Sequence, residues 1–137
     1  MQVRKRLEAF ESSPEEIDVI LLTHEHSDHV RGLDVFLRRH RAAPVWATQG
    51  TWSRIDVRSD SGGELESGKS LRVGELHVTP VKTSHDAAEP VAFVFDDGRH
   101  CAAVCTDTGK FTTLLQQRLQ GCEILLLETN HDKDMLR

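Results

Sequence analysis

Three histidines and one aspartate lie within six residues of one another, in the stretch HEHSDH at positions 24–29. This stretch directly follows the apolar run IDVILLT. Side chains two apart at the end of a strand point to the same side, so His24 and His26 can direct both imidazole rings at one point. Asp28 and His29 come where the next helix is expected to begin, and they can turn toward a second point nearby.

These side chains have the chemistry of metal ligands. Neutral imidazole and ionised carboxylate bind zinc, manganese and iron in proteins. A bound divalent cation would offset the cost of gathering such groups in one place. The alternative is a solvated loop that happens to be rich in histidine, and the density of ligand types in so short a stretch favours the metal site.

A metal needs more ligands than one loop supplies, and three later residues are candidates. His85 follows VTPVKTS, Asp107 follows CAAVCT, and His131 follows ILLLETN. Each stands after an apolar run, where the ends of neighbouring strands would bring it to a common rim beside the first loop. The remaining histidines, His40, His77 and His100, lack this context and are expected to be surface or packing residues.

The elements that must position these residues are read from apolar periodicity. Helical spacing predicts helices over residues 2–11, from Val30 to about His40, briefly over TQGTWSRI, and over FTTLLQQRL with Phe111, Leu114, Leu115 and Leu119 inward. Strands are predicted for IDVILL, PVWA, LRV, ELHVTPV, VAFVF, HCAAVC and a buried EILLLET, with residues 57–69 as a polar loop. The turn Asp96-Asp97-Gly98-Arg99 predicts a hairpin. This order is typical of an α/β protein in which helices cover sheets.

Composition limits the classes of partner and compartment. The 137 residues suit one domain, and 17 Lys and Arg against 22 Asp and Glu give a net charge of −5. A broad nucleic-acid surface usually carries a basic excess, so an anionic substrate would need a local positive centre here. Three cysteines without paired spacing argue against a disulfide framework, and Cys101 and Cys105 are expected to be small core residues. No apolar run reaches membrane-spanning length and the start lacks a secretory signal, which favours the cytoplasm.

With these residues identified, the chain resembles the metallo-β-lactamase superfamily, whose HxHxDH signature matches THEHSDH. Within that superfamily it is most similar to the phosphodiesterase and nuclease branch, and there to the YycJ/WalJ-like group. The stretches that carry the resemblance are LLTHEHSDHVRGL, VWATQGTW, TSHDAAEPVAF, TDTG and ETNHDKDML. The resemblance implies a four-layer αββα sandwich with two metals at one edge of the paired sheets.

The resemblance also implies roles for individual residues. The first metal would be held by His24, His26 and His85, the second by Asp28 and His29, and Asp107 would bridge both. The family places a further histidine on the second metal, in a Gly-His motif beyond the last residue here, and has strands before the first helix. The chain is therefore expected to be a single domain over residues 1–137 that is partial at both ends.

The implied function is metal-dependent hydrolysis of phosphodiester bonds in DNA or RNA, exonuclease-like, through a hydroxide bridging two divalent ions, with zinc expected and manganese an alternative. Asp28 would orient the nucleophile, and His131 could protonate the leaving group or contact the substrate. Arg31 could bind substrate phosphate, although a solvated helix face is the favoured explanation of this residue. Alternatives are a thioesterase of the same fold, disfavoured because TSHDAAEP lacks a Gly-His-x-x-Gly-His pattern, and an inactive metal-binding fragment. A zinc β-lactamase would carry cysteine at Asp107.

Overall fold

The computed structural model describes residues 2–40, 43–57 and 61–128. The chain divides into two compact units, each formed by two segments of the sequence. Unit 1 comprises Met1–Glu66 and Ala87–Pro90, and unit 2 comprises Ser67–Asp86 and Val91–Arg137. Within the described residues there is no helix long and apolar enough to cross a membrane.

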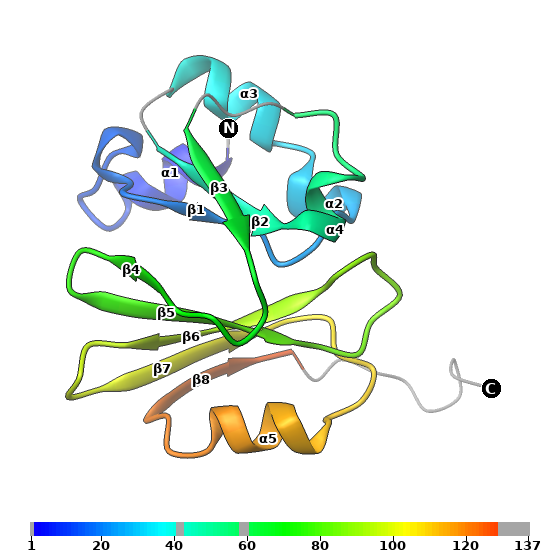
Figure 1. Ribbon diagram of the computed structural model, residues 1–137. Helices are drawn as coiled ribbons and strands as arrows, with labels where there is room; N and C mark the ends of the chain where they lie inside the picture. Colours follow the sequence, from blue (N-terminus) through cyan, green and yellow to red (C-terminus); the bar gives the residue numbers. More distant parts are fainter. Residues whose placement is uncertain (1, 41–42, 58–60, 129–137) are drawn as a thin grey trace. The chain divides into compact units, whose positions relative to one another are not determined.

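Unit 1 is a three-stranded parallel sheet with short helices around it (Figure 1). Its strands, in the order β1-β2-β3, are β1 (Ile20–Leu21), β2 (Val45–Thr48) and β3 (Gly62–Leu65). Its helices are α1 (Gln2–Glu8), the 3₁₀ turn η1 (Pro14–Glu16), α2 (Ser27–Val30), α3 (Leu33–Arg39) and α4 (Gln49–Trp52). The HEHSDH stretch begins after Thr23, beyond the end of β1, so the first strand of this sheet leads directly into the candidate site.

The core of unit 1 explains why the chain before and after HEHSDH is apolar. Leu22 at the end of the first strand packs with Leu33 of α3 and with Val45 and Ala47 of β2. Val45 and Ala47 have no exposed surface, because a central parallel strand is covered on both faces. The two ends of the motif are therefore fixed, one by strand packing and the other by helix packing.

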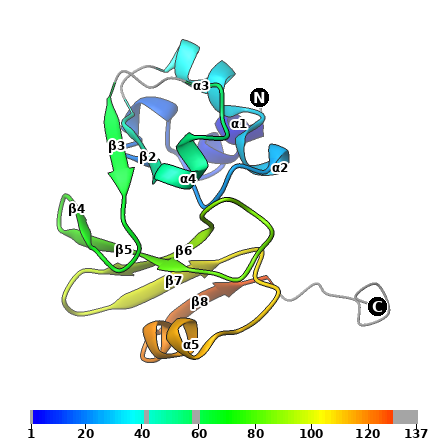
Figure 2. The same cartoon turned by 45° about the vertical axis from the view of Figure 1, so that its right-hand side comes forward.

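Unit 2 is a five-stranded sheet in the order β4-β5-β6-β7-β8. The strands are β4 (Leu71–Val73), β5 (Leu76–Lys82), β6 (Val91–Asp96), β7 (Cys101–Cys105) and β8 (Ile124–Leu127), and helix α5 (Thr113–Leu119) lies along one face (Figures 1 and 2). The first four strands are antiparallel neighbours, whereas β7 and β8 run parallel. The predicted hairpin is confirmed: β6 turns into β7 through Gly98 at φ +83°.

Helix α5 packs on the sheet of unit 2 through one narrow stripe. Leu115 and Leu119 join Ala92, Ala103 and Cys105 in the core. The sequence prediction that Phe111 and Leu114 also point inward is wrong, because both are 48% exposed. The helix begins only at Thr113, with Thr112 as its N-cap, so Phe111 lies outside it and Leu114 faces away from the sheet.

The position of Leu115 predicts a large loss of stability on truncation. Its side chain is fully buried, so Leu115→Ala should lower the free energy of unfolding by about 2–5 kcal/mol, through lost burial and the cavity left behind. Leu114→Ala in the same helix is the matched control and should change it by less than about 1 kcal/mol. Urea or thermal unfolding followed by circular dichroism measures both, and equal losses would contradict this packing of α5.

Strand β3 and the two helices α2 and α3 also differ from the sequence prediction. The polar loop at 57–69 contains β3, which pairs with β2, because the Gly62–Gly63 backbone can lie against Val45 and Trp46 where a Cβ would clash. The helix predicted to run to His40 is two helices, α2 and α3, separated at Arg31 and Gly32. Glycine is a weak helix former, which favours a break there.

Two apolar segments are more exposed than predicted. Strand β8, at the end of the sheet order, leaves Ile124 68% and Leu126 62% exposed, although its run of four apolar residues predicted a buried strand. Helix α1 ends at Glu8, and Phe10 beyond it is 84% exposed. Apolar composition thus identified these segments, but the packing of the described residues decides which side chains are covered.

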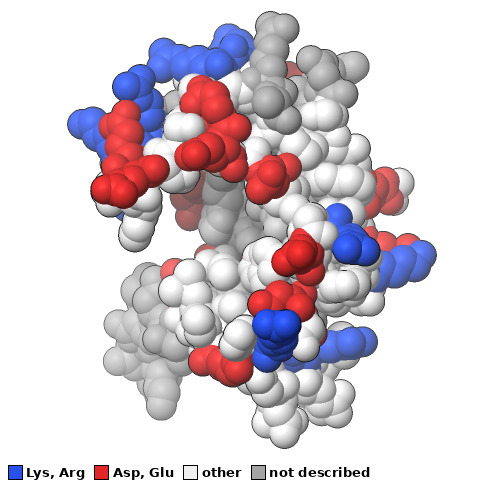
Figure 3. Space-filling view, turned by 90° about the vertical axis from the view of Figure 1, so that its left-hand side faces the viewer, with Lys and Arg blue, Asp and Glu red and all other residues white. Residues whose placement is uncertain are grey.

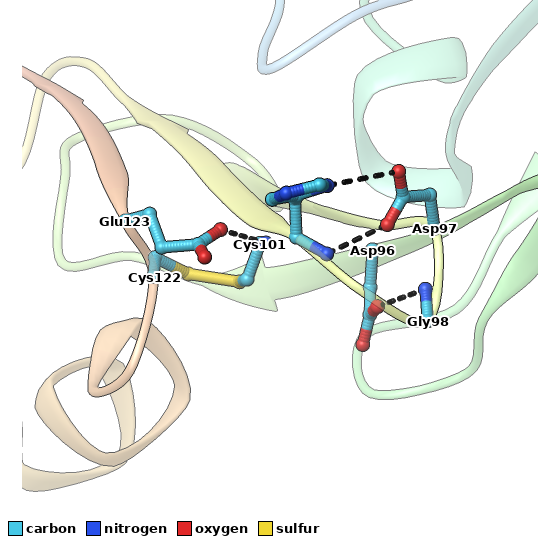
Figure 4. Close-up of a disulfide and its surroundings, with 7 residues drawn as sticks. Asp96, Asp97, Gly98, Cys101, Cys122 and Glu123 are labelled. Carbon is cyan, nitrogen blue, oxygen red and sulfur yellow. Dashed lines mark hydrogen bonds and ion pairs between the residues drawn. A yellow bond between two sulfur atoms is a disulfide. The ribbon is translucent and has the colours of Figure 1, made fainter.

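The cysteines also correct a sequence prediction. Cys105 is a fully buried core residue, as expected, but Cys101 forms a disulfide with Cys122 instead of packing as a free thiol (Figure 4). The pair joins the start of β7 to the turn before β8, with Cα atoms 4.4 Å apart. Glu123, next to Cys122, accepts a hydrogen bond from the Cys101 amide at 2.9 Å, and its own amide donates to the Cys101 carbonyl at 2.8 Å. The spacing of 21 residues gave no sign of this pairing.

Candidate metal site

Unit 1 brings the histidines of HEHSDH into one cluster. The ring of His24 lies 4.6 Å from that of His26 and 4.1 Å from that of His29, measured between ring centroids. His24 is only 1% exposed, whereas the His29 side chain is 25% exposed. The carboxylate Oδ2 of Asp28 lies 3.7 Å from Nε2 of His29, and its side chain is 79% exposed. The local part of the predicted ligand set therefore converges within one loop.

The threonine before the motif orients two of these rings. Thr23 Oγ1 lies 3.1 Å from Nδ1 of His24 and 3.3 Å from Nδ1 of His29. A hydroxyl oxygen has two lone pairs, so it can accept from both imidazoles when each carries its hydrogen on Nδ1. In that tautomer Nε2 of each ring would be the nitrogen that binds a metal, and such an outer partner is usual for metal-binding histidines.

The donor set of this loop fits a divalent transition metal. The almost fully buried imidazole of His24, the two imidazoles in contact with it and an adjacent carboxylate supply the nitrogen and oxygen ligands that zinc prefers. Imidazole rings packed this closely become mutually repulsive if more than one is protonated, whereas a metal requires them neutral. The chemistry of the loop is therefore compatible with metal binding.

Unit 2 places His85 and Asp107 in two loops that are tied together. The Gly109 amide donates to the Ser84 carbonyl at 2.7 Å, which joins the loop after β5 to the loop after β7. Asp107 has φ +51°, a left-handed conformation that aspartate tolerates better than most residues. Its amide donates to Oε2 of Glu128, at the end of β8, at 3.2 Å. Hydrogen bonds among residues that follow β5, β7 and β8 thus hold the loops that carry these two candidate ligands.

The buried thiol of Cys105 lies at the end of β7, two residues before Asp107. Burial raises the pKa of this thiol, and the Asp107 carboxylate raises it further. Cys105 therefore remains protonated at neutral pH and behaves as a core residue, not as a nucleophile or a metal ligand.

The arginines that follow HEHSDH belong to different helices. Arg31 is exposed and caps α2, whereas Arg38 belongs to α3 and pairs with Asp34 of its own helix. Figure 3 shows one face of the molecule, on which basic and acidic side chains are interspersed. Arg31 stays a candidate for substrate contact because it follows Asp28 by three residues.

The remaining residues are the histidines outside the predicted ligand set and the polar side chains beside the ligand loops. His77 and His100 are exposed and His40 bonds to Glu15 at 2.8 Å, as expected for surface or packing residues. His131 lies outside the described residues. Sequence reasoning assigned no role to Thr23, Glu25 or Glu128, which bond groups in or beside the candidate ligand loops. Only Thr23 had a local signal, as a hydroxyl directly before the motif.

Comparison with known proteins shows the family of this chain. The family described as "Beta-lactamase superfamily domain" matches residues 1–136. Exodeoxyribonuclease YycJ of Bacillus anthracis is 34% identical over 127 residues, which cover 89% of this chain and 48% of that protein. Exodeoxyribonuclease WalJ of Streptococcus pneumoniae (strain D39) is 31% identical over 131 residues, which cover 90% and 48%. The chain therefore spans about half the length of these curated relatives.

A second kind of relative is named for a different activity. A hydroxyacylglutathione hydrolase of Rhodopseudomonas palustris is 31% identical over 87 residues, covering 64% of this chain and 32% of that protein. Among solved structures, the metallo-β-lactamase fold protein YhfI of Bacillus subtilis has a TM-score of 0.70 at 18% identity, covering 82% of this chain and 49% of the other. A metallo-β-lactamase of Cronobacter sakazakii has a TM-score of 0.71 at 14% identity, covering 92% and 64%. These structures confirm the predicted fold class.

Proposed function

The chain belongs to the β-lactamase superfamily, and from this premise we propose that it is a metal-dependent phosphodiesterase that hydrolyses nucleic acid. The single observation that carries the proposal is the histidine cluster of HEHSDH, whose rings lie 4.1 and 4.6 Å apart beside the Asp28 carboxylate. A loop of this composition has few structural reasons to exist without a cation, and the fold family supplies a hydrolytic context for it.

The proposed ligand set extends beyond the HEHSDH loop. His24, His26 and His85 would hold one divalent ion, Asp28 and His29 would hold a second, and Asp107 would contribute its carboxylate to both. Zinc suits this set of imidazoles and carboxylates best, and manganese is the alternative. We propose residues 1–137 as one functional domain, although the whole activity of the relatives belongs to chains about twice as long.

The metals, when bound, lower the pKa of water and neutralise the charge that develops on phosphate. The other roles belong to side chains of this protein. Asp28 Oδ2 is proposed to orient the attacking water and accept its proton, because the carboxylate is exposed beside the histidine cluster. Arg31, one helical turn later and also exposed, would bind a phosphate oxygen of the substrate. His131 is proposed to protonate the leaving oxygen or to contact the substrate.

A nucleic-acid substrate is favoured over a thioester by the set of relatives. The two exodeoxyribonucleases align with 89% and 90% of this chain, whereas the hydroxyacylglutathione hydrolase aligns with 64%. The names of the first two favour DNA over RNA. The net charge of −5 is not an obstacle, because two divalent cations would provide the local positive centre that an anionic substrate requires.

A panel of substrates tests the function directly. The protein is reconstituted with Zn²⁺ or Mn²⁺ and offered a chromogenic phosphodiester, 5′-labelled single-stranded and double-stranded DNA, labelled RNA, and a glutathione thioester. We expect metal-dependent cleavage of the diester and of DNA with release of mononucleotides, and no turnover after chelation. Turnover of the thioester alone would select the second candidate, a thioesterase. Fewer than one metal per chain and no turnover would indicate a non-catalytic fragment.

The cytoplasmic location stays a prediction, and the Cys101–Cys122 disulfide gives a reason to examine it. Disulfides persist in oxidising compartments and are rare among cytosolic proteins. A cytoplasmic protein would hold these two cysteines as thiols for most of the time, close enough to form the bond when oxidised.

A further inference from the structure

The segment Ala87–Pro90, here called the clasp, belongs to unit 1 although β5 before it and β6 after it belong to unit 2. Three hydrogen bonds anchor it. The Ala88 amide donates to Oε1 of Glu25 at 2.7 Å, the Gly50 amide donates to Oε2 of Glu89 at 2.9 Å, and Thr48 Oγ1 donates to the Glu89 carbonyl at 2.9 Å. The clasp is thus tied both to the HEHSDH loop and to the start of α4.

Glu25, between His24 and His26, has a partly buried carboxylate. One carboxylate oxygen bonds the Ala88 amide, and the other, Oε2, is buried and accepts no hydrogen bond from any of the described residues. Burying part of a carboxylate without a partner is costly, so stability alone does not explain this residue. Among the described residues its hydrogen bond is to the clasp, which indicates that holding the clasp is its role.

The clasp in turn limits where His85 can lie. His85 precedes Ala88 by three residues, so its Cα lies within roughly 11 Å of the Ala88 Cα in any conformation of the chain. Because Ala88 is bonded to Glu25, a shift of the clasp would be passed along these three residues to the backbone of His85. We propose that Glu25 is a positioning residue that fixes the metal ligand His85 through the Ala88 amide; this rests on the metal site proposed above.

Gly50 provides a second, independent way to disturb the clasp. A Cβ at position 50 would lie 2.5 Å from the Cβ of Glu89 and 3.1 Å from the backbone of Ala88 and Glu89. Gly50 is in α4, where alanine has the higher helix propensity, so Gly50→Ala would act mainly by pushing the clasp away. Gly32→Ala is the matched control, because a Cβ at position 32 would meet nothing within 4 Å.

The first experiment observes the clasp in the metal-free protein. Hydrogen–deuterium exchange of the Ala88 amide, followed by NMR, should be slow in the wild type and in Glu25→Gln, whose amide oxygen can still accept the bond. It should be fast in Glu25→Ala and in Gly50→Ala. Exchange at Ala88 that is the same in all four proteins would overturn the proposal without reference to any metal.

The second experiment measures Zn²⁺ affinity by competition with a chromogenic chelator. Glu25→Ala and Gly50→Ala should each weaken the site by about 10- to 100-fold, as is usual when an outer partner of a ligand is lost. Glu25→Gln should restore most of the affinity. Glu64→Ala, which removes an exposed glutamate of β3, and Gly32→Ala should leave it unchanged. The Co²⁺ absorption spectrum should also shift in Glu25→Ala, because a displaced His85 changes the coordination number.

A double-mutant cycle identifies the residue through which Glu25 acts. If Glu25 acts through His85, then Glu25→Ala has no further effect on Zn²⁺ affinity in a His85→Ala background. An undiminished effect there would mean that Glu25 acts on its neighbours His24 and His26, and would overturn the proposal. A wild-type protein that binds no Zn²⁺ would instead remove the proposed metal site itself, so the two failures are distinguishable.

Discussion

Replacing Asp28 with alanine is expected to lower phosphodiesterase activity by about 10²- to 10⁴-fold, the range that a positioned proton-transfer group contributes. In the proposed site this carboxylate does two things: it holds one metal with His29 and it orients the attacking water. Both are lost together. The protein should also bind one metal instead of two, as measured by elemental analysis after dialysis.

The fold should survive this substitution, which makes the result easy to interpret. Asp28 is 79% exposed and lies in the first turn of α2, so its removal costs only the interaction with the helix N-terminus, about 0.3–1 kcal/mol. Asp34→Ala in α3 is the matched control, since Asp34 is also an exposed helical aspartate and bonds only its neighbour Arg38 in the described structure. Asp34→Ala should retain full activity and metal content. An Asp28→Ala protein with wild-type turnover would remove the proposed role.

Asp107→Asn should have the second large effect, a loss of Zn²⁺ affinity greater than about 100-fold for at least one of the two ions, since a ligand matters more than its outer partners. Asparagine keeps the size of the side chain and, like aspartate, tolerates the left-handed backbone at φ +51°. The substitution therefore removes the charge of the carboxylate that is proposed to bridge the ions, while the backbone amide of residue 107 can still donate to Glu128. Calorimetric titration with Zn²⁺ measures the change.

The control for this experiment is Asp96→Asn in the same unit. Asp96 Oδ1 accepts a hydrogen bond from the Gly98 amide at 2.7 Å, and asparagine can accept the same bond, so only the charge changes. Metal affinity should be unaffected. If Asp107→Asn binds both ions as tightly as the wild type does, Asp107 is not a bridging ligand, and the two-metal arrangement would need another carboxylate.

The outer partners show why some site residues could not be found in the sequence. Glu25 and Ala88 are 63 positions apart, and nothing in the local pattern joins them. Asp107 and Glu128 are 21 apart, and they meet only because β7 and β8 pair in parallel. Thr23 is different: it directly precedes the motif, so its hydroxyl could have been considered from sequence alone.

Local chemistry is what the sequence by itself determined. The spacing of His24, His26 and His29 brings their rings together because a strand end and the first turn of a helix have fixed geometries, and the Gly98 hairpin follows from its turn residues. Tertiary structure alone decided which apolar residues are buried, that Gly62–Leu65 pairs as a strand, that Cys101 meets Cys122, and that the clasp lies against Glu25. Each of these features depends on contacts between segments that are distant in the chain. A short stretch of sequence does not show which distant segment it will meet.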